Sequence, residues 1–485
     1  MSRIVFFADG GAAIGSGHVM RCLALASVFA NGGWKVSFAV NAEASETVAA
    51  LSQSGHEVAI LPDGEAEEAA ALVRCWPGGT DIFVVDHYGR GAAFERACRP
   101  WAKRIVVIDD LANRPYDADA LADAGNPAEA YGRLVPPGCA VLAGLQYAIV
   151  HSKFRGLREQ TLLRRDGCPV ERVLVSFGQI DAPNATACAL EALKAADFAG
   201  EVDVVLGSAA PHLADVRAQA GGRVRLHVDT DEMAALMSAA DLAVGAGGGT
   251  AWERCCLGLP TVLVEIAENQ RGVIATLLAA QAGMDAGMAD EGLAGRIGER
   301  LRGLLQNAGL RRDMAARAAS LVDGRGALRI LFAAIGSEAA RDGAAVTLRA
   351  AEHEDENWLL ELQRKPETRR HANDSAPPKE EDHRRWFART LSDAGRRLAI
   401  VRHGEWRSGM IRLDRGADAV RVSIAIDPAF HRLGVGAAAL ALAARVMPGS
   451  SLEAEILPEN GASKALFSAA GYRQVSAKLF RRDPA

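Results

Sequence analysis

The segment Gly15-Ser16-Gly17-His18, near the N-terminus, combines residue types that suit phosphate binding and proton transfer. Glycine lets the backbone approach a ligand closely, and histidine titrates near neutral pH. A β-forming run over residues 3–8 precedes the segment, and apolar residues at helical spacing follow it over residues 19–29. The N–H groups and positive dipole end of such a helix would suit an anion. The spacing predicts a functional histidine in an anion-binding loop; a histidine that only caps the helix is the alternative.

Polar clusters also follow four other strand-like runs in the first two thirds of the chain. They are Asp86-His87-Tyr88, Asp109-Asp110, Gly247-Gly248-Gly249-Thr250 with Glu253, and Glu268-Asn269-Gln270. Glycines before a helix let a diphosphate lie against backbone N–H groups, and Glu253 could accept hydrogen bonds from ribose hydroxyls. A flexible turn with an ordinary first-turn glutamate would give the same sequence. Likewise, Asp86, Asp109 and Asp110 could be loop-capping carboxylates.

A third glycine loop lies near the C-terminus, in His431-Arg432-Leu433-Gly434-Val435-Gly436-Ala437. It follows a strand-like run and opens a helix rich in alanine and leucine, a context that predicts a cradle for a pyrophosphate. The G-x-G-x-x-G dinucleotide fingerprint is absent from the first two blocks of the sequence, which argues against a dehydrogenase.

Composition limits the class of protein. A chain of 485 residues, 49% of them apolar, predicts about three domains with sizeable cores. The net charge of -5 gives no reason to expect a nucleic-acid partner. We see no signal peptide and no apolar run of the ~20 residues that span a bilayer, so we expect no membrane partner. Eight scattered cysteines without metal-ligand spacing predict reduced thiols, a cytoplasmic location and no metal site.

Strand-like runs alternate with helix-like stretches through two successive blocks. The expected strands are residues 4–8, 35–40, 57–61, 81–86 and 104–108, and then 172–178, 202–207, 223–227, 241–244 and 261–264. The alternation predicts an α/β fold with two doubly wound, Rossmann-like domains. Ligands bind at the C-terminal ends of the strands in such sheets, so the cleft between the two domains is the expected site.

The pattern changes after the second block. Residues 336–345 are small, polar and glycine-containing, which predicts a linker. From residue 346, a charged helical stretch and alternating apolar runs predict an α+β domain. The expected domains are therefore residues 1–153, 154–335 and 346–485.

Six motifs within about residues 3–335 closely resemble the UDP-sugar hydrolases of pseudaminic acid biosynthesis. They are GSGHVMRCLALA, VVDHY, VIDDLANRPYDAD, VSFG, GAGGGTAWERCCLGLP and AENQ. That family has the two-domain GT-B architecture and releases UDP from UDP-2,4-diacetamido-2,4,6-trideoxy-β-L-altropyranose. The resemblance implies inversion without a metal, with His18 as general base and Tyr88 and Asn269 in the sugar site. It implies UDP-sugar contacts from Gly15, Gly17, Arg21, Asp86, Gly248, Gly249, Thr250 and Glu253.

Residues 346–482 resemble the GCN5-related N-acetyltransferases. The glycine loop matches their acetyl-coenzyme A signature, with His431 at a position that usually holds glutamine or arginine. The resemblance implies coenzyme contacts from His431, Arg432, Gly434, Gly436, Ala437, Asn460 and Ser463. Phe467 stands near the place of the usual general-acid tyrosine; Tyr472 is available nearby, but its position favours packing. His371, Glu380, His383 and Trp386 fall in the region that would face substrate, or form a solvated charged helix.

Taken together, the two resemblances predict a bifunctional enzyme that acetylates the 4-amino group of a UDP-sugar and then hydrolyses the product. Acetyl-CoA would be the co-substrate, the other partner would be the small-molecule UDP-sugar, and the chain would be a monomer or weak homo-oligomer. Three alternatives stay open: a GT-B glycosyltransferase with an acceptor other than water, a nucleotide-sugar-binding regulator, and an acetyltransferase domain that uses a different amine.

Overall fold

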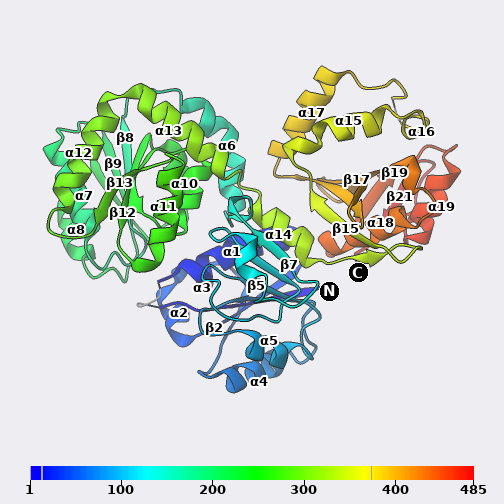
Figure 1. Ribbon diagram of the computed structural model, residues 1–485, viewed down its shortest axis with the longest axis horizontal. Coiled ribbons are helices and arrows are strands. Elements are labelled where there is room, and N and C mark those ends of the chain that lie inside the picture. Colours follow the sequence, from blue (N-terminus) through cyan, green and yellow to red (C-terminus); the bar gives the residue numbers. More distant parts are fainter. Residues whose placement is uncertain (1, 12–14, 373, 485) are drawn as a thin grey trace.

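The computed structural model describes residues 2–11, 15–372 and 374–484, which form three α/β or α+β domains (Figure 1). The first domain contains β1 (Arg3–Ala8), α1 (Gly17–Ala30), β2 (Lys35–Val40), α2 (Ala42–Thr47), α3 (Ala49–Gln53), β3 (Glu57–Ile60), α4 (Glu65–Cys75), β4 (Ile82–Asp86), α5 (Ala92–Cys98), β5 (Ile105–Ile108), β6 (Ala120–Asp123), η1 (Ala128–Tyr131), β7 (Ala140–Ala143) and η2 (Leu145–Tyr147). Its strands are parallel, in the order β3-β2-β1-β4-β5-β6-β7.

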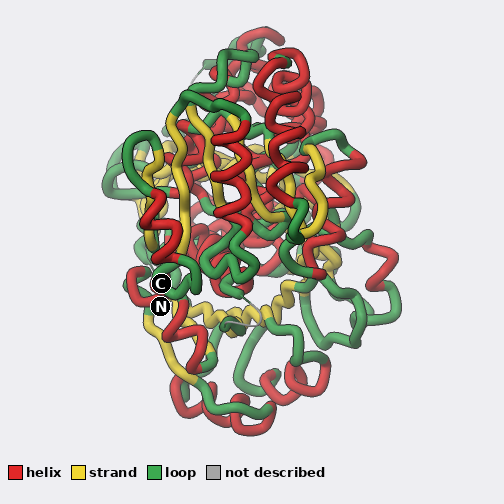
Figure 2. Tube along the Cα trace, turned by 90° about the vertical axis from the view of Figure 1, so that its left-hand side faces the viewer, coloured by secondary structure: helices red, strands yellow, loops and turns green. Residues whose placement is uncertain are grey.

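The second domain repeats this plan. It contains α6 (Ser152–Arg164), β8 (Arg172–Ser176), α7 (Ala185–Ala195), β9 (Glu201–Leu206), α8 (Leu213–Gln219), β10 (Val224–Val228), α9 (Met233–Ala239), β11 (Leu242–Ala246), α10 (Thr250–Cys256), β12 (Thr261–Glu265), η3 (Glu268–Gln270), α11 (Arg271–Ala279), β13 (Met284–Met288), α12 (Leu293–Gln306) and α13 (Ala308–Leu321). The parallel order is β10-β9-β8-β11-β12-β13. Figure 2 shows this sheet in front, between its helices.

The second sheet therefore has the 3-2-1-4-5-6 order of doubly wound folds, and the first has the same order with β7 added after β6. The order reverses between β1 and β4 in the first sheet and between β8 and β11 in the second. Strands such as β1 and β4 are buried and mostly β-branched or aromatic, which explains why the sequence pattern found them. The pattern missed β6 and β7, whose sequences ALAD and AVLA are half alanine, and β13, whose sequence MDAGM contains aspartate and glycine.

The third domain is an α+β unit. It contains β14 (Glu338–Ala339), β15 (Ala345–Ala350), η4 (His353–Asp355), α15 (Glu356–Arg364), α16 (Pro366–Arg369), α17 (Glu380–Ser392), β16 (Arg396–His403), β17 (Trp406–Arg415), β18 (Val420–Ile426), η5 (Pro428–Phe430), α18 (Val435–Val446), β19 (Leu452–Glu455), α19 (Gly461–Ala469), β20 (Arg473–Gln474) and β21 (Leu479–Arg482). Its sheet is antiparallel except between β18 and β19, which are parallel and pair only at Val420–Leu452 and Arg421–Glu453. The two strands separate beyond those pairs.

Two boundary predictions need correction. Residues 336–345 do not form a free linker, because β14 lies within them and pairs with β15 of the third sheet. The helix α14 (Gly326–Ala334), which we assigned to the second domain, packs on α1 and β15 instead. Its residues are buried on nearly every side, so the helix needs apolar partners on both faces. The sequence alone does not say which domains supply them.

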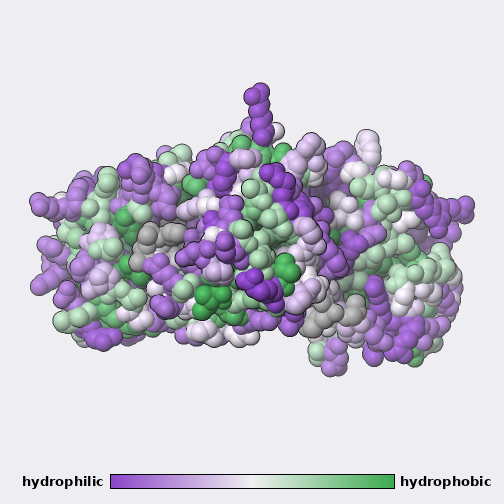
Figure 3. Space-filling view, turned by 90° about the horizontal axis from the view of Figure 1, so that it is seen from below, coloured by the Kyte–Doolittle hydropathy of each residue, from purple (hydrophilic) through white to green (hydrophobic). Residues whose placement is uncertain are grey.

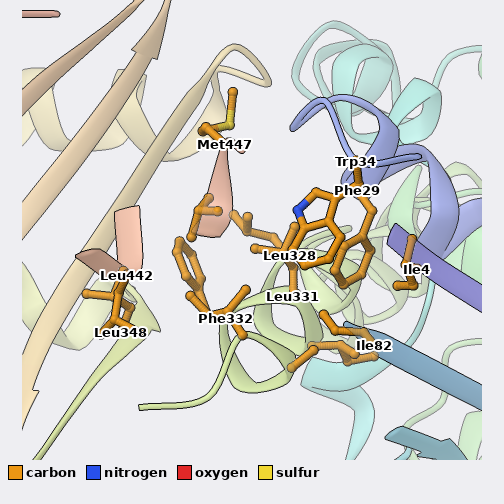
Figure 4. Close-up of a cluster of buried hydrophobic side chains, with 14 of the residues drawn as sticks. Ile4, Phe29, Trp34, Ile82, Leu328, Leu331, Phe332, Leu348, Leu442 and Met447 are labelled. Atoms are coloured by element: carbon orange, nitrogen blue, oxygen red, sulfur yellow. The ribbon is translucent and has the colours of Figure 1, made fainter. Parts of the chain in front are cut away.

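The first and third domains share one hydrophobic core around α14 (Figure 4). Its labelled members are Ile4, Phe29, Trp34 and Ile82 of the first domain, Leu328, Leu331 and Phe332 of α14, and Leu348, Leu442 and Met447 of the third domain. The turn after α1 also touches the turn after α18: a Cβ on Gly33 would lie 2.6 Å from the Cα of Gly449. The third domain is therefore packed directly on the first.

The two chain ends lie close together at this junction (Figure 1). Hydrophilic side chains cover much of the face seen from below, with hydrophobic residues scattered among them (Figure 3). Within the described part of the chain, every helix is too short or too polar to cross a membrane.

Candidate active sites

His18 and Asp86 meet at the switch point of the first sheet. Asp86 is the last residue of β4, and His18 lies in the first turn of α1, which follows β1. Because β1 and β4 are the adjacent strands where the order reverses, the two residues lie at the position where such sheets bind ligands. His18 Nδ1 is 2.5 Å from Asp86 Oδ1, and both side chains are buried.

Arg21, one turn along α1 from His18, fixes the Asp86 carboxylate. Its Nε donates to Asp86 Oδ2 at 2.6 Å and its Nη2 to Oδ1 at 2.6 Å. Burial opposes ionisation of Asp86, but the charges and hydrogen bonds of Arg21 and His18 hold its pKa well below the ordinary value. An ionised carboxylate only accepts hydrogen bonds, so the Asp86 contact favours the tautomer with the proton on Nδ1; Arg21 Nη2 also lies 3.1 Å from this nitrogen. The contacts of His18 among the described residues are made by Nδ1, which leaves Nε2 on the side of the ring away from Asp86.

Tyr88 and Asp110 extend this network toward the second domain. Asp110 Oδ2 accepts hydrogen bonds from Arg21 Nη1 at 2.8 Å and from the Tyr88 hydroxyl at 3.2 Å. The Tyr88 ring stands edge-on to the His18 ring, with 4.4 Å between centroids. Burial and the charge of Asp110 raise the pKa of Tyr88 to about 12, and Asn269 of the second domain lies within hydrogen-bonding reach of its hydroxyl.

The structure thus brings the three expected catalytic positions together: His18 and Tyr88 from the first domain, and Asn269, which is exposed in η3, from the second. For Asp86, which we predicted to contact the UDP-sugar, the structure shows a different position. Its side chain is fully buried behind His18 and bonded to Arg21, which explains why it has no surface left for a ligand.

Sequence reasoning left open whether Asp110 only caps a loop; in the structure its carboxylate links Arg21 and Tyr88. A second buried network supports its loop. The Tyr131 hydroxyl contacts Asp109 Oδ2 at 2.8 Å and Asp123 Oδ2 at 2.6 Å. In the sequence, only the repeated aspartates at strand ends indicated this network. Tyr131 lies in a short 3-10 helix, η1, which contains no recognisable motif.

The glycine loop of the second domain follows β11, at the switch point of the second sheet. A Cβ on Gly247 would lie 2.3 Å from Ile274 Cγ1, so Gly247 serves packing. A Cβ on Gly248 or Gly249 would meet open space or one distant amide. In this fully described loop, the N–H groups of Gly248, Gly249 and Thr250 have no acceptor, so they remain available to an anion.

Glu253 lies in the first turn of α10, behind this loop, and Arg254 follows it. Burial raises the pKa of Glu253 to about 7, although its neighbour Arg254 favours ionisation. The Arg254 guanidinium itself is directed inward: Nη1 donates to Thr250 Oγ1 at 3.3 Å. Gly15 and Gly17 complete the predicted UDP-sugar set on the opposite domain; a Cβ on either would meet no atom of the described residues within 4 Å.

The third glycine loop lies between β18 and α18. Arg432 and Gly434 have positive φ angles of 65° and 85°. Throughout the described segment from Arg432 to Ala437, the backbone N–H groups have no acceptor. A helix N-terminus with free N–H groups, beside strands β18 and β19 that separate, fits the pyrophosphate and chain of acetyl-CoA. His431 turns away from the loop, with Nε2 3.0 Å from the Ile426 carbonyl oxygen.

Other predicted positions of the third domain have structural partners. Asn460 Oδ1 accepts a hydrogen bond from Ser463 N at 3.0 Å and caps α19. His383 is buried, with Nε2 3.1 Å from the Glu356 carbonyl oxygen. The Tyr472 ring packs edge-on against Phe467, 4.9 Å between centroids, and burial raises its pKa above the ordinary value. These contacts agree with a packing role for Tyr472.

The remaining residues of the predicted substrate-facing region lie around α17 and the segment before it. Trp386 is half-buried, with the Arg412 guanidinium 5.6 Å from its ring centroid. Glu380 is exposed and bonded to Arg384 at 2.9 Å. Within the described residues around it, the buried His371 Nδ1 has no hydrogen-bond partner. Of the predicted set, His383 and Trp386 lie together on α17, with 5.2 Å between their ring centroids.

Strand order and site geometry define the class: two Rossmann-type domains in a GT-B-like pair, followed by an acetyltransferase domain. Residues 345–473 match the model of the acetyltransferase (GNAT) domain. The chain is 25% identical over 341 residues to the spore coat polysaccharide biosynthesis protein SpsG of Bacillus subtilis, an alignment that covers 68% of this chain and 96% of that protein.

The N-terminal region also resembles the UDP-2,4-diacetamido-2,4,6-trideoxy-beta-L-altropyranose hydrolase of Campylobacter jejuni. The two are 24% identical over 242 residues, which are 49% of this chain and 81% of that one. Among solved structures, MurG of Acinetobacter baumannii aligns with 68% of this chain and 98% of its own, at 14% identity and a TM-score of 0.46. The sequence similarities support a bifunctional sugar-modifying enzyme.

Proposed function

We propose that the first two domains hydrolyse UDP-2,4-diacetamido-2,4,6-trideoxy-β-L-altropyranose to the free sugar and UDP, with His18 as general base. The observation that carries the proposal is the buried pair of His18 and Asp86, which lies beside Tyr88 and within reach of Asn269 from the facing domain. The resemblance to the Campylobacter hydrolase supports this choice of substrate.

In the proposed reaction, His18 Nε2 takes a proton from a water molecule as the water oxygen attacks the anomeric carbon. The bond between that carbon and the diphosphate oxygen breaks, and its electron pair leaves with UDP. Attack opposite the leaving group inverts the centre. Asp86 holds the imidazole in the tautomer that the step needs and stabilises the imidazolium that forms.

The second domain would hold the UDP group. The free N–H groups at Gly248, Gly249 and Thr250 stabilise negative charge that grows on the leaving diphosphate. Glu253, once ionised, accepts hydrogen bonds from the ribose hydroxyls. Tyr88 and Asn269 line the sugar site where the two domains meet.

The third domain would acetylate the 4-amino group of the precursor UDP-amino-sugar. Acetyl-CoA supplies an activated acetyl group as a thioester, which the amine nitrogen attacks with loss of the thiol. The Arg432–Ala437 segment binds the pyrophosphate through its N–H groups, and the gap between β18 and β19 orients the thioester. Two consecutive reactions on one chain would raise the local concentration of the intermediate.

NMR of the full chain with acetyl-CoA and the UDP-4-amino-sugar tests both reactions. We expect an N-acetyl signal first and then free-anomer signals together with UDP. An N-acetylated sugar that stays joined to UDP would contradict the hydrolase assignment. Sugar that is released only when an added acceptor is present would identify a glycosyltransferase instead.

A further inference from the structure

Arg341 joins the third glycine loop, residues 431–437 and called the coenzyme loop from here on, to the segment that connects the third domain with the first two. It lies in the turn between β14 and β15, before the matched acetyltransferase residues 345–473. Its backbone N–H donates to the Leu433 carbonyl oxygen at 2.8 Å. Its Nη1 donates to the Arg432 carbonyl oxygen at 3.3 Å. Arg341 thus binds two consecutive carbonyl groups of the coenzyme loop.

These two hydrogen bonds determine the direction of two N–H groups. In a trans peptide the carbonyl and the following N–H point in opposite directions. Because the carbonyls of Arg432 and Leu433 face Arg341, the N–H groups of Leu433 and Gly434 point to the other side. In the described loop, those two N–H groups are among the ones without an acceptor.

The backbone of the loop needs such support. Arg432 has a φ of 65°, which is unfavourable for a residue with a side chain. Gly434 has a φ of 85°, and a Cβ there would lie 3.0 Å from Arg341 Cγ. Arg341 therefore packs against the loop as well as bonding to it.

The turn that carries Arg341 is itself fixed on the third domain. Asp342 Oδ2 is 2.9 Å from His403 Nε2, and the His403 ring packs on Phe430 at 5.5 Å between centroids. Phe430 lies just before the coenzyme loop. The turn and the loop are thus held together from two sides.

We propose that Arg341 is a positioning residue of the coenzyme site: it aims the N–H groups of Leu433 and Gly434 at the pyrophosphate of acetyl-CoA. The proposal rests on the acetyltransferase function proposed above. It places part of the coenzyme site in the junction with the first two domains, outside the matched domain.

Calorimetric titration of the full-length protein with acetyl-CoA and with S-acetylpantetheine, which lacks the pyrophosphate, tests this role. We expect Arg341→Ala to bind acetyl-CoA about tenfold more weakly, the effect of one lost hydrogen bond from a charged donor. Binding of S-acetylpantetheine should not change, since it makes no use of the two N–H groups. Arg341→Lys, which keeps a donor, should recover part of the affinity.

Arg445→Ala is the matched control. Arg445 lies at the same junction and contacts Glu338 and the carbonyl oxygens of Ile335 and Ser337, but not the loop. We expect its acetyl-CoA affinity to equal that of the unmodified protein. Unchanged acetyl-CoA affinity in Arg341→Ala, or an equal loss for both ligands, would overturn the role of Arg341 alone. Failure of the unmodified protein to bind acetyl-CoA would overturn the acetyltransferase function as well.

Discussion

Arg397 of the third domain donates a hydrogen bond of 2.8 Å to the carbonyl oxygen of Val28 in α1. Its other terminal nitrogen donates to the Val446 carbonyl oxygen at 3.2 Å. Burial, helped by the charges of Arg415 and Arg155, lowers the pKa of Arg397 to about 9. Since Val28 and His18 lie on one helix, the acetyltransferase domain packs on the element that carries the proposed catalytic base.

This shared packing predicts that the first and third domains lose stability together. Leu331→Ala in α14 removes a fully buried side chain from the common core, at a cost of about 2–5 kcal/mol. We expect urea to unfold both domains at a lower concentration in this variant, measured by tryptophan fluorescence and by loss of both activities. Leu310→Ala, at an exposed position on α13, should shift stability by no more than about 0.5 kcal/mol. Independent transitions for the two domains would contradict the prediction.

Asp86→Asn tests the orientation of His18. The asparagine amide can donate to Nδ1 and so favours the tautomer with the proton on Nε2, which cannot accept a proton from water. We expect hydrolysis to fall by roughly 10²–10⁴-fold with little change in UDP affinity. His18→Ala should lose activity to a similar extent and still bind UDP.

The control for this change is Asp203→Asn. Asp203 is also buried and contacts a histidine, with Oδ1 2.8 Å from His227 Nε2, but it lies in β9 of the second domain. Hydrolysis should be nearly unchanged in this variant. An active Asp86→Asn enzyme would remove Asp86 from the mechanism.

The raised pKa of Glu253 predicts that UDP-sugar affinity depends on pH. With a pKa of about 7, its carboxyl is mostly protonated at pH 6 and mostly ionised at pH 8. The ionised form accepts hydrogen bonds from ribose, so affinity should rise about tenfold from pH 6 to pH 8. We suggest titrations in the His18→Ala background, where the UDP-sugar stays intact. Glu253→Gln should bind weakly at both pH values; an identical slope in that variant would exclude Glu253 as the source.

Tyr472→Phe separates packing from catalysis in the acetyltransferase domain. In the described structure, the Tyr472 hydroxyl is buried and has no hydrogen-bond partner, while the ring packs on Phe467. Removing an unpaired hydroxyl should leave the acetyl-transfer rate within about twofold and stability unchanged or slightly higher. A loss of kcat with unchanged acetyl-CoA affinity would instead identify Tyr472 as the general acid.

Much of the fold was readable from local sequence. Buried parallel strands are short apolar runs, and glycine loops follow them directly, so β1, β4, β8 and β11 and their loops could be found from spacing alone. The strands β6 and β7 were not predicted, because alanine-rich runs of four residues are as typical of helices or loops as of strands. The packing partners of α14 could not be predicted, because a helix that is apolar on all sides has no polar face to show how it is oriented.

The sequence by itself determined which residues are candidates for the proposed chemistry: His18, the three glycine loops and Glu253 stand in contiguous motifs whose residue types restrict what they can do. Only the tertiary structure decided which of their neighbours in space they contact. Asp86 became a partner of His18 because β1 and β4 lie side by side at the switch point, 68 positions apart in the chain. Arg341 likewise contacts the coenzyme loop only because the fold brings the two segments together. Hydrogen bonds and packing depend on distance in space, which local residue patterns do not encode.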